Sequence, residues 1–242
     1  MQTHVVMIAY QRPKIILEAI ERFKSCTDFE GLDFVFSVYD FGYPIPNKIA
    51  NRQIVGDACL KEGIVYKTRP NKGVSGNYDQ IFEDMMPKKT DIIAFFDPDS
   101  APRNKNWLKE AKQIIEHENA AYVTLSRPVA DAAQASVVKK KGDMSYKELT
   151  RACGWPMGIF SGEFVRKNLG KFFNGNQYGY FENHLLKLMD ESDMKGYILL
   201  SQVDDGFIHV QQEYDQIYLD WKMRWARQST KRSFEQYLTR QK

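Results

Sequence analysis

The segment TDIIAFFDPDS, residues 90–100, indicates the fold class of this chain. Its first part, residues 90–96, is strongly apolar, and an apolar run without polar alternation is typical of a strand in a sheet covered on both faces. Asp97-Pro98-Asp99 follows this strand at once. Carboxylates directly after a buried strand predict a polar site at the edge of an α/β sheet.

Apolar runs alternate with helical patterns through the first half of the chain. Pro13 suits the first turn of a helix, and Ile16, Ile20 and Phe23 then recur at helical spacing. This alternation requires crossover connections and predicts an α/β fold with a mostly parallel central sheet flanked by helices. The expected strands cover residues 4–9, 32–39, 64–68, 90–96 and 122–125, and the expected helices begin at Pro13 or cover residues 48–62, 73–86 and 106–118.

Polar residues follow four of these strands at the points where they end. In open α/β sheets, ligands bind beyond the carboxyl ends of the strands. We therefore expect one site to be lined by residues 10–12, Asp40, residues 69–73 and residues 97–100.

The Asp97-Pro98-Asp99 turn is the most informative part of this expected site. Residues two apart in extended chain point to the same side, and Pro98 stiffens the turn. Two adjacent carboxylates repel each other unless a cation lies near them, and oxygen ligands suit Mg²⁺ or Mn²⁺. Such an ion would stabilise the charge on a leaving diphosphate, whereas the alternative interpretation is a solvated turn.

Size, composition and cysteines restrict the class of protein. The chain has 242 residues, 43% of them hydrophobic and 27% charged, with a formal net charge of +3. This is ordinary globular composition, and the weak basicity permits anionic partners without requiring them. Cys26, Cys59 and Cys153 are odd in number and far apart, which predicts reduced thiols in a cytoplasmic protein. We expect no signal peptide and no membrane span, so any contact with the inner membrane face would be peripheral.

The expected layout is a main domain over residues 1–211 and a tail over residues 212–242. The domain divides into two halves, residues 1–100 and residues 101–211. Residues 129–145 are interpreted as a surface loop, either a lid over the site or a loop without a role. The tail has a helical pattern with basic and aromatic residues, which suits an anionic membrane, nucleic-acid phosphates or a solvated helix face.

Several segments of the chain resemble, in the same order, those of family 2 glycosyltransferases of the GT-A (Rossmann-like) fold, from Val5 to His209. Tyr39-Asp40 resembles the second-strand aspartate that binds the nucleotide base, and Asp97 and Asp99 match the Asp-x-Asp metal motif. The other matching segments are YQR (10–12), RPNKGVSGN (69–77), MGIFSGEFVRKNLGKF (157–172), YGYFENHLLKL (178–188) and KGYILLSQVDDGFIHV (195–210), the last of which resembles the family's closing strand.

The resemblance implies a metal-dependent hexosyl or related transferase that takes sugar from a nucleoside diphosphate sugar, in the first place a UDP-sugar. The implied acceptor is a hydroxyl group of a glycan or a lipid-linked sugar. The resemblance also implies a GT-A-like catalytic domain in which residues 1–100 are the nucleotide-sugar-binding half and residues 101–211 the acceptor half. Mn²⁺ or Mg²⁺ would be held by Asp97, Asp99 and His209. The implied donor-binding residues are Tyr10, Arg12, Asp40, Arg69, Asn71, Lys72, Gly73, Asn77 and Asp97, and the candidate acceptor residues are Trp155, Tyr180 and Asn183.

The chain departs from the family pattern at its expected catalytic base. Relatives commonly carry Glu-Asp where this chain has Glu182-Asn183. Because asparagine cannot take a proton, the base would be Glu182, or Asp204 or Asp205, or none would be needed, as in a retaining mechanism.

A second departure lies at Gly76, where many relatives carry a basic residue facing the diphosphate. Arg12, Arg69 or Lys72 would then supply the positive charge.

Each of these functional interpretations has a structural alternative. Asp40 could cap a turn, and Trp155 could be a core residue. His209 could be structural, and Glu182 could be a carboxylate that the helix dipole stabilises at a helix N-terminus. At the level of the whole chain, the alternatives are a glycosyltransferase acting on modified DNA bases, a nucleotidyltransferase, or a non-catalytic nucleotide-sugar or glycan-binding module.

Overall fold

The computed structural model describes residues 2–10, 13–42, 48–98, 100–102, 105–125, 136–150, 157–173, 181–200 and 207–209. The strands are β1 (Thr3–Ala9), β2 (Phe34–Asp40), β3 (Val65–Thr68), β4 (Ile92–Phe96), β5 (Ser100–Pro102), β6 (Tyr122–Thr124), β7 (Lys139–Lys141), β8 (Met144–Glu148), β9 (Met157–Ser161), β10 (Gly196–Leu199) and β11 (Phe207–His209). The helices are α1 (Pro13–Ser25), α2 (Lys48–Lys61), α3 (Gly73–Met85), α4 (Trp107–Glu118), α5 (Gly162–Lys167) and α6 (Phe181–Glu191).

The central sheet is mixed rather than mostly parallel, which corrects the expectation from sequence. In the described part of the chain its order is β3-β2-β1-β4-β9-β6-β10-β8-β7, and β11 pairs with β5 in a separate ladder. β1 to β4 are parallel, as are β6 and β10, whereas β9, β8 and β7 pair antiparallel with their neighbours. Regular alternation with helices holds only through the first half. In the second half, a two-residue turn joins β7 to β8, and such a turn allows only antiparallel pairing.

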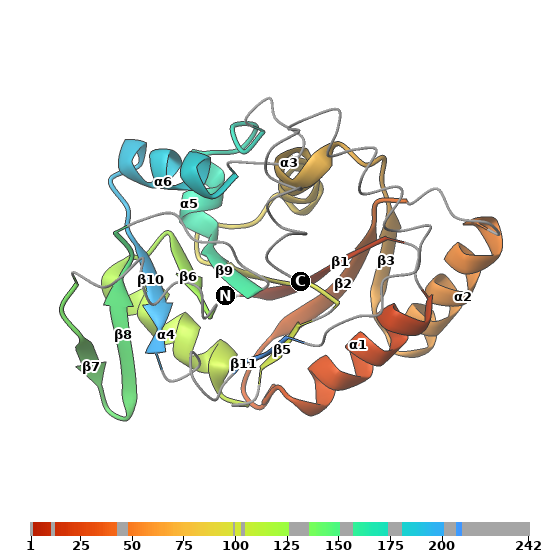
Figure 1. Cartoon of the computed structure of the whole chain (residues 1–242), viewed down its shortest axis with the longest axis horizontal. Coiled ribbons are helices and arrows are strands. Elements are labelled where there is room, and N and C mark those ends of the chain that lie inside the picture. The colour runs from red at the N-terminus through yellow and green to blue at the C-terminus, as the bar shows by residue number, and fades with distance from the viewer. Residues whose placement is uncertain are drawn as a thin grey trace, which may run out of the picture.

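Helices cover both faces of this sheet. α1, α2 and α4 lie on one face, and α3, α5 and α6 lie on the other (Figure 1). Alternate side chains of β1 enter the two cores, with Val5 and Met7 on the α1 side and Val6 and Ile8 on the α3 side. This burial on both faces explains why the strands have continuous apolar sequences and confirms that part of the prediction.

Most expected elements of the first half are confirmed within one or two residues of their predicted ends. The segment over residues 195–210 differs, because it contains two strands rather than one closing strand. β10 enters the main sheet, and β11 leaves it to pair with β5.

Part of the segment interpreted as a surface loop is a sheet-edge hairpin. β7 and β8 occupy residues 139–148, joined through Gly142, whose φ of +60° suits a tight turn. Met144 and Tyr146 are buried. The lid interpretation is therefore wrong for residues 139–145, and residues 129–135 lie outside the described residues, as does the expected tail.

Candidate functional site

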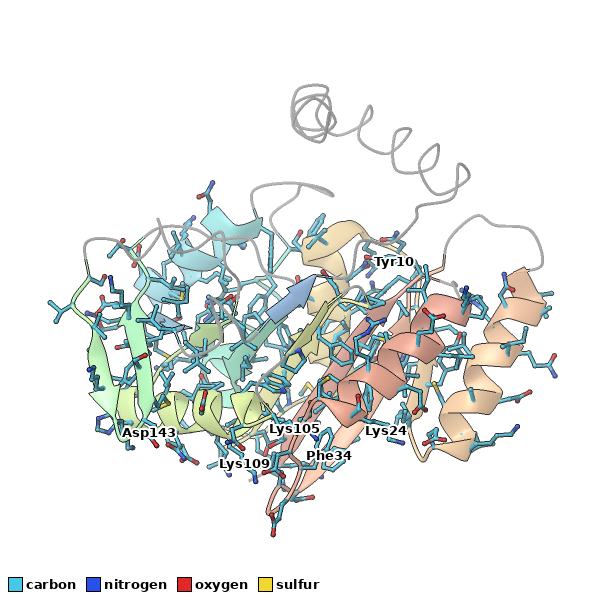
Figure 2. All side chains as sticks on the ribbon, turned by 60° about the horizontal axis from the view of Figure 1, so that its bottom comes forward. Tyr10, Lys24, Phe34, Lys105, Lys109 and Asp143 are labelled. Carbon is cyan, nitrogen blue, oxygen red and sulfur yellow. The ribbon has the colours of Figure 1, made fainter. Side chains whose placement is uncertain are left out.

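The carboxyl ends of β1 to β4 meet at one edge of the sheet. Ala9 pairs with Asp40 and Asp40 pairs with Thr68, while Met7 pairs with Phe96 on the other side of β1. Tyr10 lies beyond the end of β1, and Phe34 at the start of β2 lies at the opposite edge (Figure 2).

β1 has β2 on one side and β4 on the other, so the chain reverses its direction of strand addition between β1 and β4. Such a switch point is where α/β sheets form their ligand crevice. Tyr10 and Asp97 follow these two strands, and the predicted location of the site is therefore consistent with the fold.

Tyr10 lies in a field of negative charge. Burial raises the pKa of its hydroxyl most, and the carboxylates of Asp97 and Asp40 raise it further, while a hydrogen bond with Asn77 lowers it. Tyr10 therefore remains a neutral phenol at physiological pH. The structure brings these four predicted site residues together, and a cation or a hydrogen-bonding ligand is what this electrostatic environment favours.

Asp40 has a structural role that is visible in its contacts. Its Oδ1 accepts a hydrogen bond from the Gly42 N–H at 2.9 Å, and its Oδ2 accepts one from the Tyr66 hydroxyl at 2.8 Å. The side chain is fully buried. Asp40 therefore caps the turn after β2, and binding of a nucleotide base by Asp40 stays a prediction.

The segment before α3 is held by side-chain amides. Asn71 Oδ1 accepts from the Gly73 N–H at 2.9 Å and from Asn77 Nδ2 at 3.1 Å. Asn77 Oδ1 accepts from the Lys72 N–H at 2.9 Å, and Gln80 Nε2 donates to the Pro70 carbonyl at 3.0 Å. We call residues 69–73, which carry predicted donor-binding residues, the donor loop. Asn71 of this loop and Asn77 of α3 fix its shape, and Gln80, which sequence analysis missed, belongs to the same network.

Gly73 begins α3 with a φ of +83°, which is the left-handed region that favours glycine. Asn77 near the start of α3 hydrogen-bonds with Tyr10, so the N-terminal end of α3 lies at the same edge as Tyr10 and Asp97. Because peptide dipoles give a helix N-terminus partial positive charge, this end suits an anionic group such as a phosphate.

The cations expected near a diphosphate differ in their placement. Arg69 Nη2 lies 2.6 Å from Asp84 Oδ2, and Lys67 Nζ lies 3.9 Å from the same oxygen. Hydrogen bonding to Asp84 raises the pKa of Arg69 and holds its guanidinium against the flank of α3. Lys72 is exposed, and Arg12 lies outside the described residues. Lys72 is thus the described candidate that is better placed to meet an anion.

The absence of a basic residue at position 76 has a steric reason. A Cβ on Gly76 would lie 2.7 Å from the Lys72 Cβ and 3.3 Å from the Phe173 ring. The donor loop and residue 173 both approach α3 closely here. Any side chain at this position would push them apart.

The turn predicted to bind a metal ion, Asp97-Pro98-Asp99, is described in part. Arg22 Nη1 of α1 donates to the Pro98 carbonyl at 3.3 Å, which anchors the turn after Asp97. His209 pairs with Ser100 in the β5–β11 ladder, so its backbone lies opposite the residue that follows Asp99. Asp99 and the side chain of His209 lie outside the described residues. Within the residues that are described, three or more His, Cys, Asp or Glu side chains do not gather around one point.

The candidate base Glu182 and the candidate acceptor residue Asn183 lie on the first turn of α6. Asn183 is exposed there, and the side chain of Glu182 lies outside the described residues. Phe181 stacks on Tyr78 of α3 with ring centroids 4.8 Å apart, which fixes the start of α6. The remaining predicted residues, Trp155, Tyr180, Asp204 and Asp205, also lie outside the described part.

Membrane contact and nucleic-acid contact were predicted from the tail, residues 212–242, and stay predictions. In the part of the chain that is described, none of the helices has the length and apolar character that crossing a bilayer would require.

Comparisons with known proteins agree with this architecture. The crystal structure of S. aureus TarS 1-349 in complex with UDP-GlcNAc is similar, with a TM-score of 0.56 and 16% identity, covering 90% of this chain and 60% of that chain. The mannosyltransferase PcManGT from Pyrobaculum calidifontis, in complex with GDP-Man and Mn²⁺, has a TM-score of 0.60 and 13% identity, covering 93% and 60%. At such identities the likeness shows the fold alone, which is a GT-A-like α/β fold with a mixed sheet.

This chain spans about 60% of the length of those two proteins. The search of curated proteins gave no match. A family model described as Glycosyl transferase family 2 matches residues 4–174, which is well over half of the sequence. The chain therefore belongs to glycosyl transferase family 2.

Proposed function

We propose that this protein is a metal-dependent glycosyltransferase that moves a sugar from a nucleoside diphosphate sugar to a hydroxyl acceptor. The observation that carries the proposal is the convergence of Tyr10, Asn77 and Asp97 at the switch point between β1 and β4. In a chain of glycosyl transferase family 2, this is the place where a donor would bind.

The donor would lie along the strand ends from β2 to β4. Its base and ribose would lie near Tyr10 and Asp40, and its diphosphate near Lys72 and the N-terminal end of α3. UDP is the first choice of nucleotide, and UDP-GlcNAc is bound by S. aureus TarS. GDP is the second, because PcManGT binds GDP-Man.

Mn²⁺ or Mg²⁺ fits the residues at the end of β4. Carboxylate oxygens are the ligands that these ions prefer, and the negative field that raises the pKa of Tyr10 comes first from Asp97, then from Asp40. Asp97, Asp99 and His209 are the proposed ligands, with the Ser100–His209 backbone pair bringing the last two segments together. When bound, the ion would supply Lewis-acid stabilisation to the diphosphate as it leaves.

The acceptor would approach from the start of α6. Glu182 is the proposed base, because Asn183 cannot take a proton, and Asp204 or Asp205 are the alternatives. Trp155, Tyr180 and Asn183 would contact the acceptor, which we propose to be a glycan or a lipid-linked sugar. The positively charged sugar in the transition state would be balanced chiefly by the departing phosphates, so the base contributes the smaller part.

The first experiment is a thermal unfolding series with UDP, GDP, UDP-GlcNAc, GDP-Man and UTP, each with and without Mn²⁺. A ligand at about 100 times its dissociation constant adds roughly 2.7 kcal/mol of apparent stability. We expect an Mn²⁺-dependent shift with one diphosphate and its sugar. A shift with UTP alone would instead favour nucleotidyl transfer, and no shift with any nucleotide would contradict a donor site.

A further inference from the structure

Three consecutive residues of α3 make contacts with three different segments, two of which belong to the proposed site. A helix turns by about 100° per residue, so Asn77, Tyr78 and Asp79 point in three directions from one turn. Asn77 holds the donor loop through the Lys72 N–H at 2.9 Å. Tyr78 stacks on Phe181 at the start of α6, with ring planes 7° apart. These contacts join the donor loop to α6 through one helix.

Asp79 makes the third contact and has no task in the donor site. Its Oδ1 accepts from the Phe172 N–H at 3.1 Å, and its Oδ2 accepts from the Phe173 N–H at 2.7 Å. The side chain is only 8% exposed. Burial raises the pKa of Asp79, and the two N–H donors oppose that rise by favouring the carboxylate. A displacement of residues 172–173 would leave a buried carboxylate without these donors, which is costly.

The same short segment is tied to α6 from its other side. His184 Nε2 lies 2.6 Å from the Lys171 carbonyl, a contact that requires the proton to be on Nε2. Phe172 is fully buried and packs on Phe82 of α3 at 4.6 Å between ring centroids. Residues 171–173 are therefore held between α3 and α6.

We propose that α3 couples the donor loop to the acceptor end of α6, and that Asp79 is the positioning residue that makes this coupling. The proposal rests on the proposed function, because it assigns the donor to the loop and the acceptor to α6. Nucleotide binding at residues 69–73 would stiffen α3 through Asn71 and Asn77. Asp79 and Tyr78 would carry that stiffening to residues 171–173 and to the turn that bears Glu182.

The test is amide hydrogen exchange with UDP and with GDP, each with Mn²⁺, on the full chain and on Asp79→Asn. In the unmodified protein, nucleotide should slow exchange at residues 69–77, 171–173 and 181–185. In Asp79→Asn, one acceptor becomes an NH₂ donor facing an N–H donor, so the effect at 171–173 should fall about tenfold. The effect at 181–185 should fall less, because Tyr78 still stacks on Phe181. Nucleotide affinity should stay within about threefold, because the donor-loop contacts of Asn77 are intact. Glu83→Gln, which removes an exposed carboxylate one turn further along α3, is the matched control and should behave as the unmodified protein.

Turnover separates positioning from a merely structural role. In hydrolysis of UDP-GlcNAc or GDP-Man, Asp79→Asn should lower kcat about tenfold and leave the donor KM within about threefold. If Asp79→Asn does not fold, His184→Ala is the second variant, because it removes the contact with the Lys171 carbonyl and His184 is more exposed than Asp79. It should lower kcat in the same way, by a smaller factor. Slowed exchange at 69–77 without any change at 171–173 and 181–185 would overturn the coupling alone. No change at any residue with either nucleotide would overturn the coupling together with the proposed function.

Discussion

Two groups of carboxylates and tyrosines lie in separate parts of the sheet, and they differ in what the carboxylates contact. At the end of α4, Glu118 accepts hydrogen bonds from Lys139, Tyr146 and Tyr197. Burial alone would raise the pKa of Glu118, but these three donors lower it to about 2. We call this the Glu118 cluster. Its carboxylate is matched by a cation, and its effect is to stabilise the fold.

At the carboxyl ends of β1 and β4, burial raises the pKa of Tyr10 most, and the carboxylates of Asp97 and Asp40 raise it further. Asp40 is bound by Gly42 and Tyr66 and contributes to the fold, whereas Asp97 is a proposed metal ligand. A carboxylate matched by a cation indicates a structural role, whereas carboxylates that gather beside a tyrosine at a strand-end crevice suit a cation or ligand. Substitutions in the two groups should therefore separate stability from binding.

The largest effect is expected for Asp97→Asn. Removing this carboxylate should lower donor turnover by about 100-fold or more, because it is a proposed metal ligand. The stability of the free protein should change by less than about 1 kcal/mol, since negative charge at this edge decreases. Turnover of UDP-GlcNAc or GDP-Man and urea unfolding measure the two quantities. Asp57→Asn on exposed α2 is the control, and full Mn²⁺-dependent activity in Asp97→Asn would remove Asp97 from the metal site.

Glu118→Gln should give the opposite result. The pKa of Glu118 falls from 4.5 in the unfolded chain to about 2 in the folded protein, so its stabilising effect is complete above pH 4.5. This pKa shift corresponds to about 3 kcal/mol of unfolding free energy at pH 7, which Glu118→Gln should lose. Nucleotide binding by the variant should be unchanged.

The pH dependence of unfolding tests this assignment. As pH falls from 4.5 towards 2, the unmodified protein should lose that contribution, and Glu118→Gln should not. Glu116→Gln, an exposed position on the same helix, is the control. If Glu118→Gln and Glu116→Gln lost stability equally between pH 4.5 and 2, the Glu118 cluster would not be the cause of the acid-induced loss of stability.

The same contrast shows which features of the molecule could be predicted from the sequence. The strand ends were predictable because a buried parallel strand needs apolar residues on both faces, and Asp97 follows such a strand. The Glu118 cluster was not predictable, because Lys139 lay in a segment interpreted as a loop and Tyr146 directly follows that segment. Short hairpins give weak patterns, and long-range contacts such as Glu118 with Tyr197 have no local signal. Asp79 was missed for the same reason, since its partners are backbone groups 93 and 94 residues away.

Gly76→Arg should have an intermediate effect on stability. A side chain here meets the Lys72 Cβ at 2.7 Å, and overpacking of this kind costs about 1–3 kcal/mol. Adding the basic residue that relatives carry should therefore weaken nucleotide binding rather than strengthen it, because the donor loop moves. Gly76→Ala separates the effect of side-chain volume from the effect of charge. If the cause is steric, alanine alone gives most of the loss of unfolding free energy measured in urea. Tighter UDP or GDP binding in Gly76→Arg would show that charge outweighs packing at this position.

The smallest effect compares one tyrosine from each group. Tyr66→Phe removes a 2.8 Å hydrogen bond from fully buried Asp40, and Tyr146→Phe removes one of the same length from Glu118, which is 15% exposed. Glu118 keeps Lys139 and Tyr197, and water can reach it in part. Tyr66→Phe should therefore cost about 1–2 kcal/mol and Tyr146→Phe about half of that, measured by urea unfolding. If Asp40 only caps its turn, Tyr66→Phe changes nucleotide affinity by less than about threefold. A larger loss of affinity, absent in Tyr146→Phe, would place the Tyr66–Asp40 pair in contact with the base. Loss of the hydrogen bond to Asp40 Oδ2 changes nucleotide affinity only if the nucleotide contacts this pair.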